Sequence, residues 1–103
     1  MIRHIVALRF PAGTTQQTKD DLYAALAGLK SQIEGILSFH ASRNVTIEPL
    51  SRVFDDVFWF DFRDTAVRDV YLMHPAHQAI GARIVAATGG GAEGVFVFDV
   101  EVP

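Results

Sequence analysis

Three residues that can bind or move protons lie close together in the stretch YLMHPAHQAI, residues 71–80. The stretch contains Tyr71, His74 and His77, with Pro75 between the two histidines. Proline is favoured at the first position of a helix, so the spacing predicts that His74 is the N-cap and His77 the third helical residue. The positive end of the helix dipole disfavours an imidazolium there, and a neutral imidazole can act as a general base. On this stretch alone a structural interpretation comes first: His74 caps the helix, and His77 packs with its hydrogen bond satisfied.

A further histidine, His4, lies in the middle of the alternating segment IRHIVALRF, residues 2–10. Strand side chains repeat every two residues, which predicts one shared face for His4, Val6, Leu8 and Phe10. We expect helices to cover that face, because the aromatic face of a later strand needs the larger cover. If His4, Tyr71 and His77 reach one apolar cavity, the helix start becomes a site for chemistry.

Other polar groupings in the chain predict less chemistry. His74 and His77 do not complete a metal site, because imidazole sites usually need further ligands, often a carboxylate. Asp55 and Asp56 are adjacent in a predicted strand and point to opposite faces, so we expect a solvated strand end and no catalytic dyad. The glycine-rich run TGGGAEG, 88–94, lacks the lysine of a phosphate-binding loop and precedes a strand. We therefore expect neither a cofactor nor a bound metal.

Length and composition narrow the class of protein. The chain has 103 residues, no cysteine and a net charge of −3, which fits one domain over residues 1–103 without disulfides or a thiol nucleophile. The nine basic residues are scattered, which argues against nucleic acid as a partner. The N-terminal segment lacks the continuous apolar core of a signal peptide, and no segment reaches the length of a membrane span. We expect a cytoplasmic protein with no membrane partner.

Apolar periodicity predicts four strands and two helical regions. The predicted strands are residues 2–10, 36–45, 53–62 and 95–102. The first helical region lies between a cap at Thr14 or Thr15 and a stop at Gly35, and its apolar face consists of Leu22, Leu26, Leu29 and Ile33. The second starts at Asp64 or Thr65, runs to about Met73, and continues from Pro75 to about Ala87. This order predicts an α+β, ferredoxin-like β-α-β-β-α-β fold with an antiparallel sheet.

Helices can cover only one face of such a sheet. To the covered face we assign four phenylalanines: Phe54, Phe58, Phe60 and Phe62. To the open face we assign six residues: Ile5, Ala7, Val57, Trp59, Val95 and Val97. A monomer would expose that face as a large apolar patch. We therefore expect a homodimer through the open sheet face, with Trp59 as an interface anchor.

The chain resembles the stress-responsive dimeric α/β-barrel (Dabb) domain family over nearly its whole length. The matching segments are IRHIVALRF, the turn PAG, ALAGLKSQIEGILSFHASRNV, EPLSR, YLMHPAHQAI and GVFVFDVEV. The family implies two ferredoxin-like subunits whose sheets form one barrel, with the helices outside. Most members have no assigned reaction. One plant branch consists of polyketide cyclases that run an intramolecular aldol condensation without a cofactor.

The cyclase branch implies roles for individual residues. His77 matches the catalytic base, His4 the strand histidine and Tyr71 a pocket tyrosine, while His74 matches a histidine that members share. Leu26 stands where the cyclases have a second pocket tyrosine, and it cannot donate to a carbonyl oxygen. The resemblance thus implies proton transfer without implying that specific cyclisation. The predicted catalytic residues are His77, His4 and Tyr71, and the predicted substrate-binding residues are His74, Leu26 and Phe60.

Two classes of function follow as hypotheses. The first is a cofactor-independent enzyme of lyase or cyclase type, in which His77 removes a proton next to the carbonyl of a hydrophobic compound while His4 and Tyr71 hold the oxygen. The second is a non-catalytic dimer that binds a small hydrophobic ligand or serves in a stress response. A cofactor-free monooxygenase is a third hypothesis, supported by fold alone. An open cavity with both histidine rings in reach of one bound atom separates the first hypothesis from the second.

Overall fold

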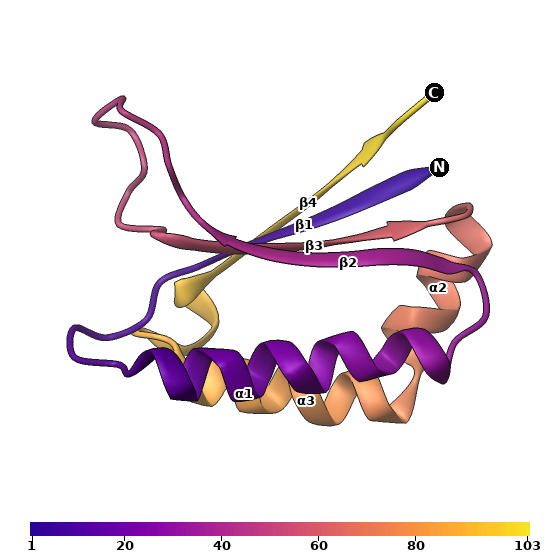
Figure 1. The fold of residues 1–103 in the computed structure, drawn as a ribbon, viewed down its shortest axis with the longest axis horizontal. Helices are drawn as coiled ribbons and strands as arrows, with labels where there is room; N and C mark the ends of the chain where they lie inside the picture. Colours follow the sequence, from indigo (N-terminus) through magenta and orange to yellow (C-terminus); the bar gives the residue numbers. More distant parts are fainter.

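The fold is one four-stranded antiparallel sheet with a layer of helices on one side (Figure 1). The computed structural model describes residues 1–103. The strands are β1 (Ile2–Leu8), β2 (Ile36–Arg43), β3 (Asp56–Phe62) and β4 (Val95–Glu101), in the spatial order β2-β3-β1-β4. The helices are α1 (Gln16–Ala27), α2 (Thr65–Met73) and α3 (Pro75–Ala87), with short 3-10 helices η1 (Gly28–Ser31) and η2 (Gly91–Gly94). This arrangement confirms the predicted ferredoxin-like fold.

Short polar side chains fix where the helices begin. Thr15 caps α1 by accepting a hydrogen bond from the Thr18 backbone, and Asp64 caps α2 by accepting one from Val67. Gly35 has a φ of 95°, and a side chain there would overlap Val67, so glycine is required where the chain turns beneath α2. None of the helices is long and apolar enough to cross a membrane.

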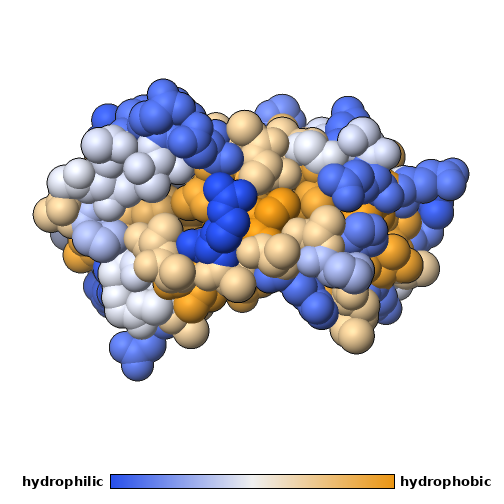
Figure 2. Space-filling model, turned by 90° about the horizontal axis from the view of Figure 1, so that it is seen from below, coloured by the Kyte–Doolittle hydropathy of each residue, from blue (hydrophilic) through white to orange (hydrophobic).

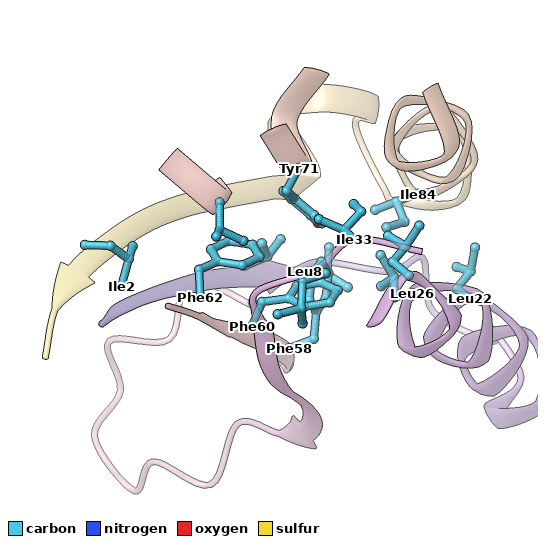
Figure 3. Close-up of a cluster of buried hydrophobic side chains, with 14 residues drawn as sticks. Ile2, Leu8, Leu22, Leu26, Ile33, Phe58, Phe60, Phe62, Tyr71 and Ile84 are labelled. Atoms are coloured by element: carbon cyan, nitrogen blue, oxygen red, sulfur yellow. The ribbon is translucent and has the colours of Figure 1, made fainter. Parts of the chain in front are cut away.

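A core of buried hydrophobic residues fills the space between sheet and helices (Figure 3). Tyr71 of α2 packs against two rings of β3, with centroid distances of 5.0 Å to Phe60 and 4.9 Å to Phe62. The predicted apolar face of the first helical region is buried in full: Leu22, Leu26, Leu29 and Ile33. These contacts hold α2 and α1 against the same face of the sheet.

The register of β4 corrects the predicted open face. Ile5 lies opposite Phe98 and Ala7 opposite Phe96, whereas Val6 lies opposite Val97. Directly opposed residues share a face, so Phe96 and Phe98 belong to the open face. The assignment of Val95 and Val97 to the open face was wrong. In the segment VFVF both alternating sets of residues are apolar, the valines and the phenylalanines. The pattern alone therefore does not determine which set faces the helices.

The loop between β2 and β3, residues 44–55, rises from the sheet on the side away from the helices (Figure 1). Arg52 and Val53 have φ values of 54° and 65°, which interrupt the extended backbone, and β3 starts only at Asp56. Phe54 therefore falls out of the strand alternation. Its ring packs against Phe96, at a centroid distance of 6.1 Å, so its predicted place on the covered face was wrong.

Asp56 also departs from its predicted environment. Its side chain is buried, with the residue only 5% exposed, and its Oδ2 atom lies 3.0 Å from Nζ of Lys19 on α1. A buried carboxylate needs such a partner. The expected solvated strand end was therefore wrong for Asp56, and the ion pair instead ties the start of β3 to α1.

Candidate functional site

A cavity of about 350 Å³ lies between the sheet and the helices, within the size range of small-ligand sites. His4 of β1, Tyr71 of α2 and His77 of α3 all line it. The ring of Tyr71 lies between the two imidazoles, with centroid distances of 5.5 Å to His4 and 4.0 Å to His77. The structure thus brings His4, from the start of the chain, together with Tyr71 and His77 of the 71–80 stretch, the three residues that the sequence singled out.

The rest of the cavity wall is mainly apolar. Most of it comes from Val6, Leu26, Phe58, Ile84, Val95 and Val97. Three lining residues, Leu72, Val85 and Val97, are also exposed at the surface, so the cavity opens to solvent at these side chains. Seen from the helix side, hydrophobic surface shows between hydrophilic side chains (Figure 2). An apolar compound that carries one polar group fits such a site.

Asp99 of β4 holds the ring of His4. The two residues lie directly opposite each other in the β1–β4 register, and Nδ1 of His4 is 2.6 Å from Oδ1 of Asp99. A carboxylate can only accept, so Nδ1 is the donor. Oδ2 of Asp99 in turn accepts a hydrogen bond of 3.3 Å from Nη1 of Arg68. This chain fixes the orientation of the ring and leaves Nε2 as the atom of His4 that can meet a ligand.

His77 is the third residue of α3, as predicted, and is half-buried. Burial lowers the pKa of its imidazole, the Leu72 backbone carbonyl partly opposes that shift, and charge on His4 or His74 lowers the pKa further. The ring is therefore neutral near neutral pH. The direction agrees with the expectation from the helix dipole, but burial is the main cause. Nδ1 of His77 is buried without a hydrogen-bond partner.

Tyr71 is the most buried of the three, with an exposed fraction of 1%. Burial raises the pKa of its phenol, and the negative charge of Asp99 raises it further. The hydroxyl therefore stays protonated and can donate a hydrogen bond. The site combines a neutral imidazole, a protonated phenol and an imidazole fixed by a carboxylate, which is a set of groups suited to acid–base chemistry.

The three predicted substrate-binding residues have different positions. Leu26 lines the cavity. His74 does not: it is the N-cap of α3, its Nδ1 accepts a hydrogen bond of 3.1 Å from the Ala76 backbone, and its ring borders a separate surface groove. Phe60 is fully buried and packs behind Tyr71 without lining the cavity. The capping bond and complete burial explain why His74 and Phe60 do not meet the cavity.

Sequence reasoning missed Asp99 and Arg68. Asp99 is the one charged residue within the apolar run VFVFDV, which was an available signal. Its role required knowledge of the register that places it opposite His4. No group of three or more histidine or carboxylate side chains is arranged to hold a metal ion.

Fold and cavity together define a small ferredoxin-like domain with acid–base groups between its sheet and its helices. The model of the stress-responsive A/B barrel domain family (Dabb) matches residues 2–102, and the chain belongs to this family. A curated relative is the stress-response A/B barrel domain-containing protein HS1 of Arabidopsis thaliana, 28% identical over 76 residues, which cover 74% of this chain and 70% of the relative.

Solved structures show the same fold. A dimeric ferredoxin-like protein of unknown function from Jannaschia sp. CCS1 is 32% identical, with a TM-score of 0.88 and 98% of each chain covered. The hydroxynitrile lyase of Passiflora edulis has a TM-score of 0.82 at 16% identity, covering 99% of this chain and 93% of the lyase. At that identity the likeness to the lyase is one of fold alone.

Proposed function

We propose that the protein is a cofactor-independent enzyme of lyase or cyclase type that transfers a proton on a hydrophobic carbonyl compound. One observation carries the proposal: Tyr71 lies between His4 and His77 at a mainly apolar cavity. A structural role for the two histidines would not require a shared open space. An enzyme that forms an enolate requires a base and an oxygen-binding group on the same bound molecule.

His77 is the proposed general base. Its pKa is lowered, so the ring is unprotonated where the reaction runs, and Nε2 takes the proton from the carbon next to the carbonyl. The electron pair of the broken C–H bond moves toward the carbonyl oxygen, which becomes an enolate oxygen. His77 then returns the proton to carbon or to the leaving group.

Tyr71 and His4 are the proposed binding groups for that oxygen. The raised pKa of Tyr71 keeps its hydroxyl a donor. The bond from Nδ1 to Asp99 fixes the His4 ring and leaves Nε2 for the ligand, and Nε2 donates to the oxygen when it carries a hydrogen. Donors fixed in advance at a mainly apolar cavity stabilise developing negative charge, and one such donor is worth about 100-fold or more in rate. Leu26 contributes only an apolar wall, so a second phenol does not take part.

We also propose that two copies pair through the open sheet face. Phe96 and Phe98 are 54% and 42% exposed there, beside an apolar groove that Ile5 and Trp59 help to line. Such a patch is typical of a face buried in an interface. The dimeric Jannaschia structure supports the proposal. Pairing would also steady β4, an edge strand that hydrogen-bonds only to β1 and carries Asp99.

The test is exchange of the acidic α-hydrogens of a panel of hydrophobic ketones and β-diketones in D₂O, followed by NMR. The wild-type protein should accelerate exchange for at least one compound, and His77→Gln should abolish the acceleration. His74→Asn is the matched control, because asparagine also caps helices, and it should retain the activity. The same spectra report whether a compound shifts the His4 and His77 ring signals together.

Two outcomes contradict the enzyme. If compounds bind and shift both rings without exchange, the protein is a non-catalytic binding dimer. If His77→Gln exchanges as fast as the wild type, His77 is not the base.

A further inference from the structure

Gly81 occupies an unfavourable place for a glycine. It lies inside α3, one helical turn after His77, and glycine is the poorest helix former after proline. Its φ is not positive, so the backbone does not require glycine there. Glycine weakens the helix here, and the backbone conformation does not account for it. The explanation should therefore lie in the atoms around Gly81.

Those surroundings are the cavity. A Cβ atom built on Gly81 would have one heavy atom within 4 Å, and that atom is Nε2 of His77, at 4.0 Å. Both residues line the cavity. The missing side chain therefore leaves open space in front of the nitrogen that we propose as the base. A methyl group on Gly81 would meet no atom within 4 Å other than this nitrogen, at an ordinary van der Waals distance.

We propose that Gly81 is the specificity-determining residue of the cavity, because its missing side chain admits a bulky ligand to Nε2 of His77. This inference rests on the proposed function for its catalytic meaning. Beyond Gly81 along α3 the lining residues are Ile84 and Val85, both apolar, whereas His77 lies one helical turn before it. The expected substrate class is therefore carbonyl compounds with a bulky apolar substituent at the reacting carbon.

The test uses diethyl pyrocarbonate, a small carbonyl reagent that acylates unprotonated imidazole nitrogens. Its rate of reaction at His77 is measured by mass spectrometry of peptides, relative to free N-acetylhistidine added to the same sample. Gly81→Ala should fold, melt no lower than the wild type, and slow the reaction at His77 by about tenfold, as a single carbon typically does in an apolar pocket. Gly81→Val should slow it further.

Gly28→Ala is the matched control. Gly28 also has helical dihedral angles, and an added Cβ there meets nothing within 4 Å. Gly28→Ala is the same substitution at a position outside the cavity, so the rate of acylation at His77 should equal that of the wild type. If Gly81→Val does not fold, Gly81→Ala decides.

The outcomes separate this inference from the proposed function. If Gly81→Ala slows acylation of His77 but the wild-type protein catalyses no α-hydrogen exchange, the role of Gly81 in access is upheld and the proposed enzymatic function is overturned. An unreactive His77 in the wild-type protein, or equal rates in the wild type and both Gly81 variants, overturns the inference, even where exchange is observed. In the exchange assay, Gly81→Ala should lose the most activity toward compounds branched at the reacting carbon.

Discussion

The polar side chains of the open sheet face and those at the cavity on the covered face differ in whether they have hydrogen-bond partners. On the open face Arg3 and Asp61 bind each other, with Nε 2.8 Å from Oδ1, and Ser38 donates to the same carboxylate. On the covered face Tyr71 and His77 surround a cavity, and their pKa values are shifted by burial. Paired polar groups suit a surface that another protein covers. Unpaired groups at an apolar cavity suit a ligand, because the ligand supplies the missing partner.

The largest expected effect is a difference in the loss of stability when an aromatic residue of each face is replaced by alanine. Phe60 is fully buried, so Phe60→Ala should lower the free energy of unfolding by about 3–5 kcal/mol through the cavity that it leaves. Phe98 is 42% exposed, so Phe98→Ala should lower it by under about 1 kcal/mol. Urea unfolding of both variants at one low protein concentration makes the comparison.

The same Phe98→Ala variant tests what covers the open face. In a sheet-to-sheet dimer its dissociation constant should rise by about tenfold or more, equal to 1.4 kcal/mol or more, as truncation of an aromatic anchor does. Sedimentation equilibrium measures this constant. An unchanged constant, or a wild-type protein that stays monomeric at high concentration, would place the partner elsewhere.

A smaller effect is expected where β4 reaches the covered face. Asp99→Ala removes the partner of the buried Nδ1 of His4 and should lower the free energy of unfolding by about 1–2 kcal/mol. It should also slow α-hydrogen exchange, because the His4 ring loses its orientation. Asp69→Ala is the control: Asp69 also binds Arg68 but belongs to an exposed pair, and its loss should stay within about 0.5 kcal/mol. Equal effects of the two variants would contradict a positioning role for Asp99.

The smallest effect is the pH dependence that His77 gives to stability. Its folded-state pKa lies below the unfolded value of about 6.5, so the unfolded chain binds more protons in that window. Stability should therefore rise with pH up to about 6.5, by at most about 1.4 kcal/mol per pH unit for one proton. His77→Asn should remove this part of the slope. A slope that persists in the variant would assign the titration to another group.

The sequence predicted the fold because its strands and helices have different apolar periods and its caps are short polar residues. It also identified His4, Tyr71 and His77 separately. The convergence of these three residues depends on strand order and helix packing, which lie outside any local pattern. The error at Phe54 arose because the positive φ values of Arg52 and Val53 interrupt the extended backbone before β3 begins at Asp56. The errors at Val95 and Val97 arose because a strand that is apolar on both faces does not reveal its register in its sequence. Asp99 escaped notice for the same reason.

The alternation of β4 has one further consequence. Val95, Val97 and Asp99 face the cavity side, and Phe96 and Phe98 face the proposed partner, so successive residues of one edge strand belong to two binding surfaces. A shift of this strand cannot change one surface alone. If the proposed ligand and the proposed partner both bind, we expect the two equilibria to be coupled, and such coupling must be reciprocal. A compound that tightens the dimer by some factor must itself bind the dimer more tightly than the monomer, in a proportion fixed by that factor.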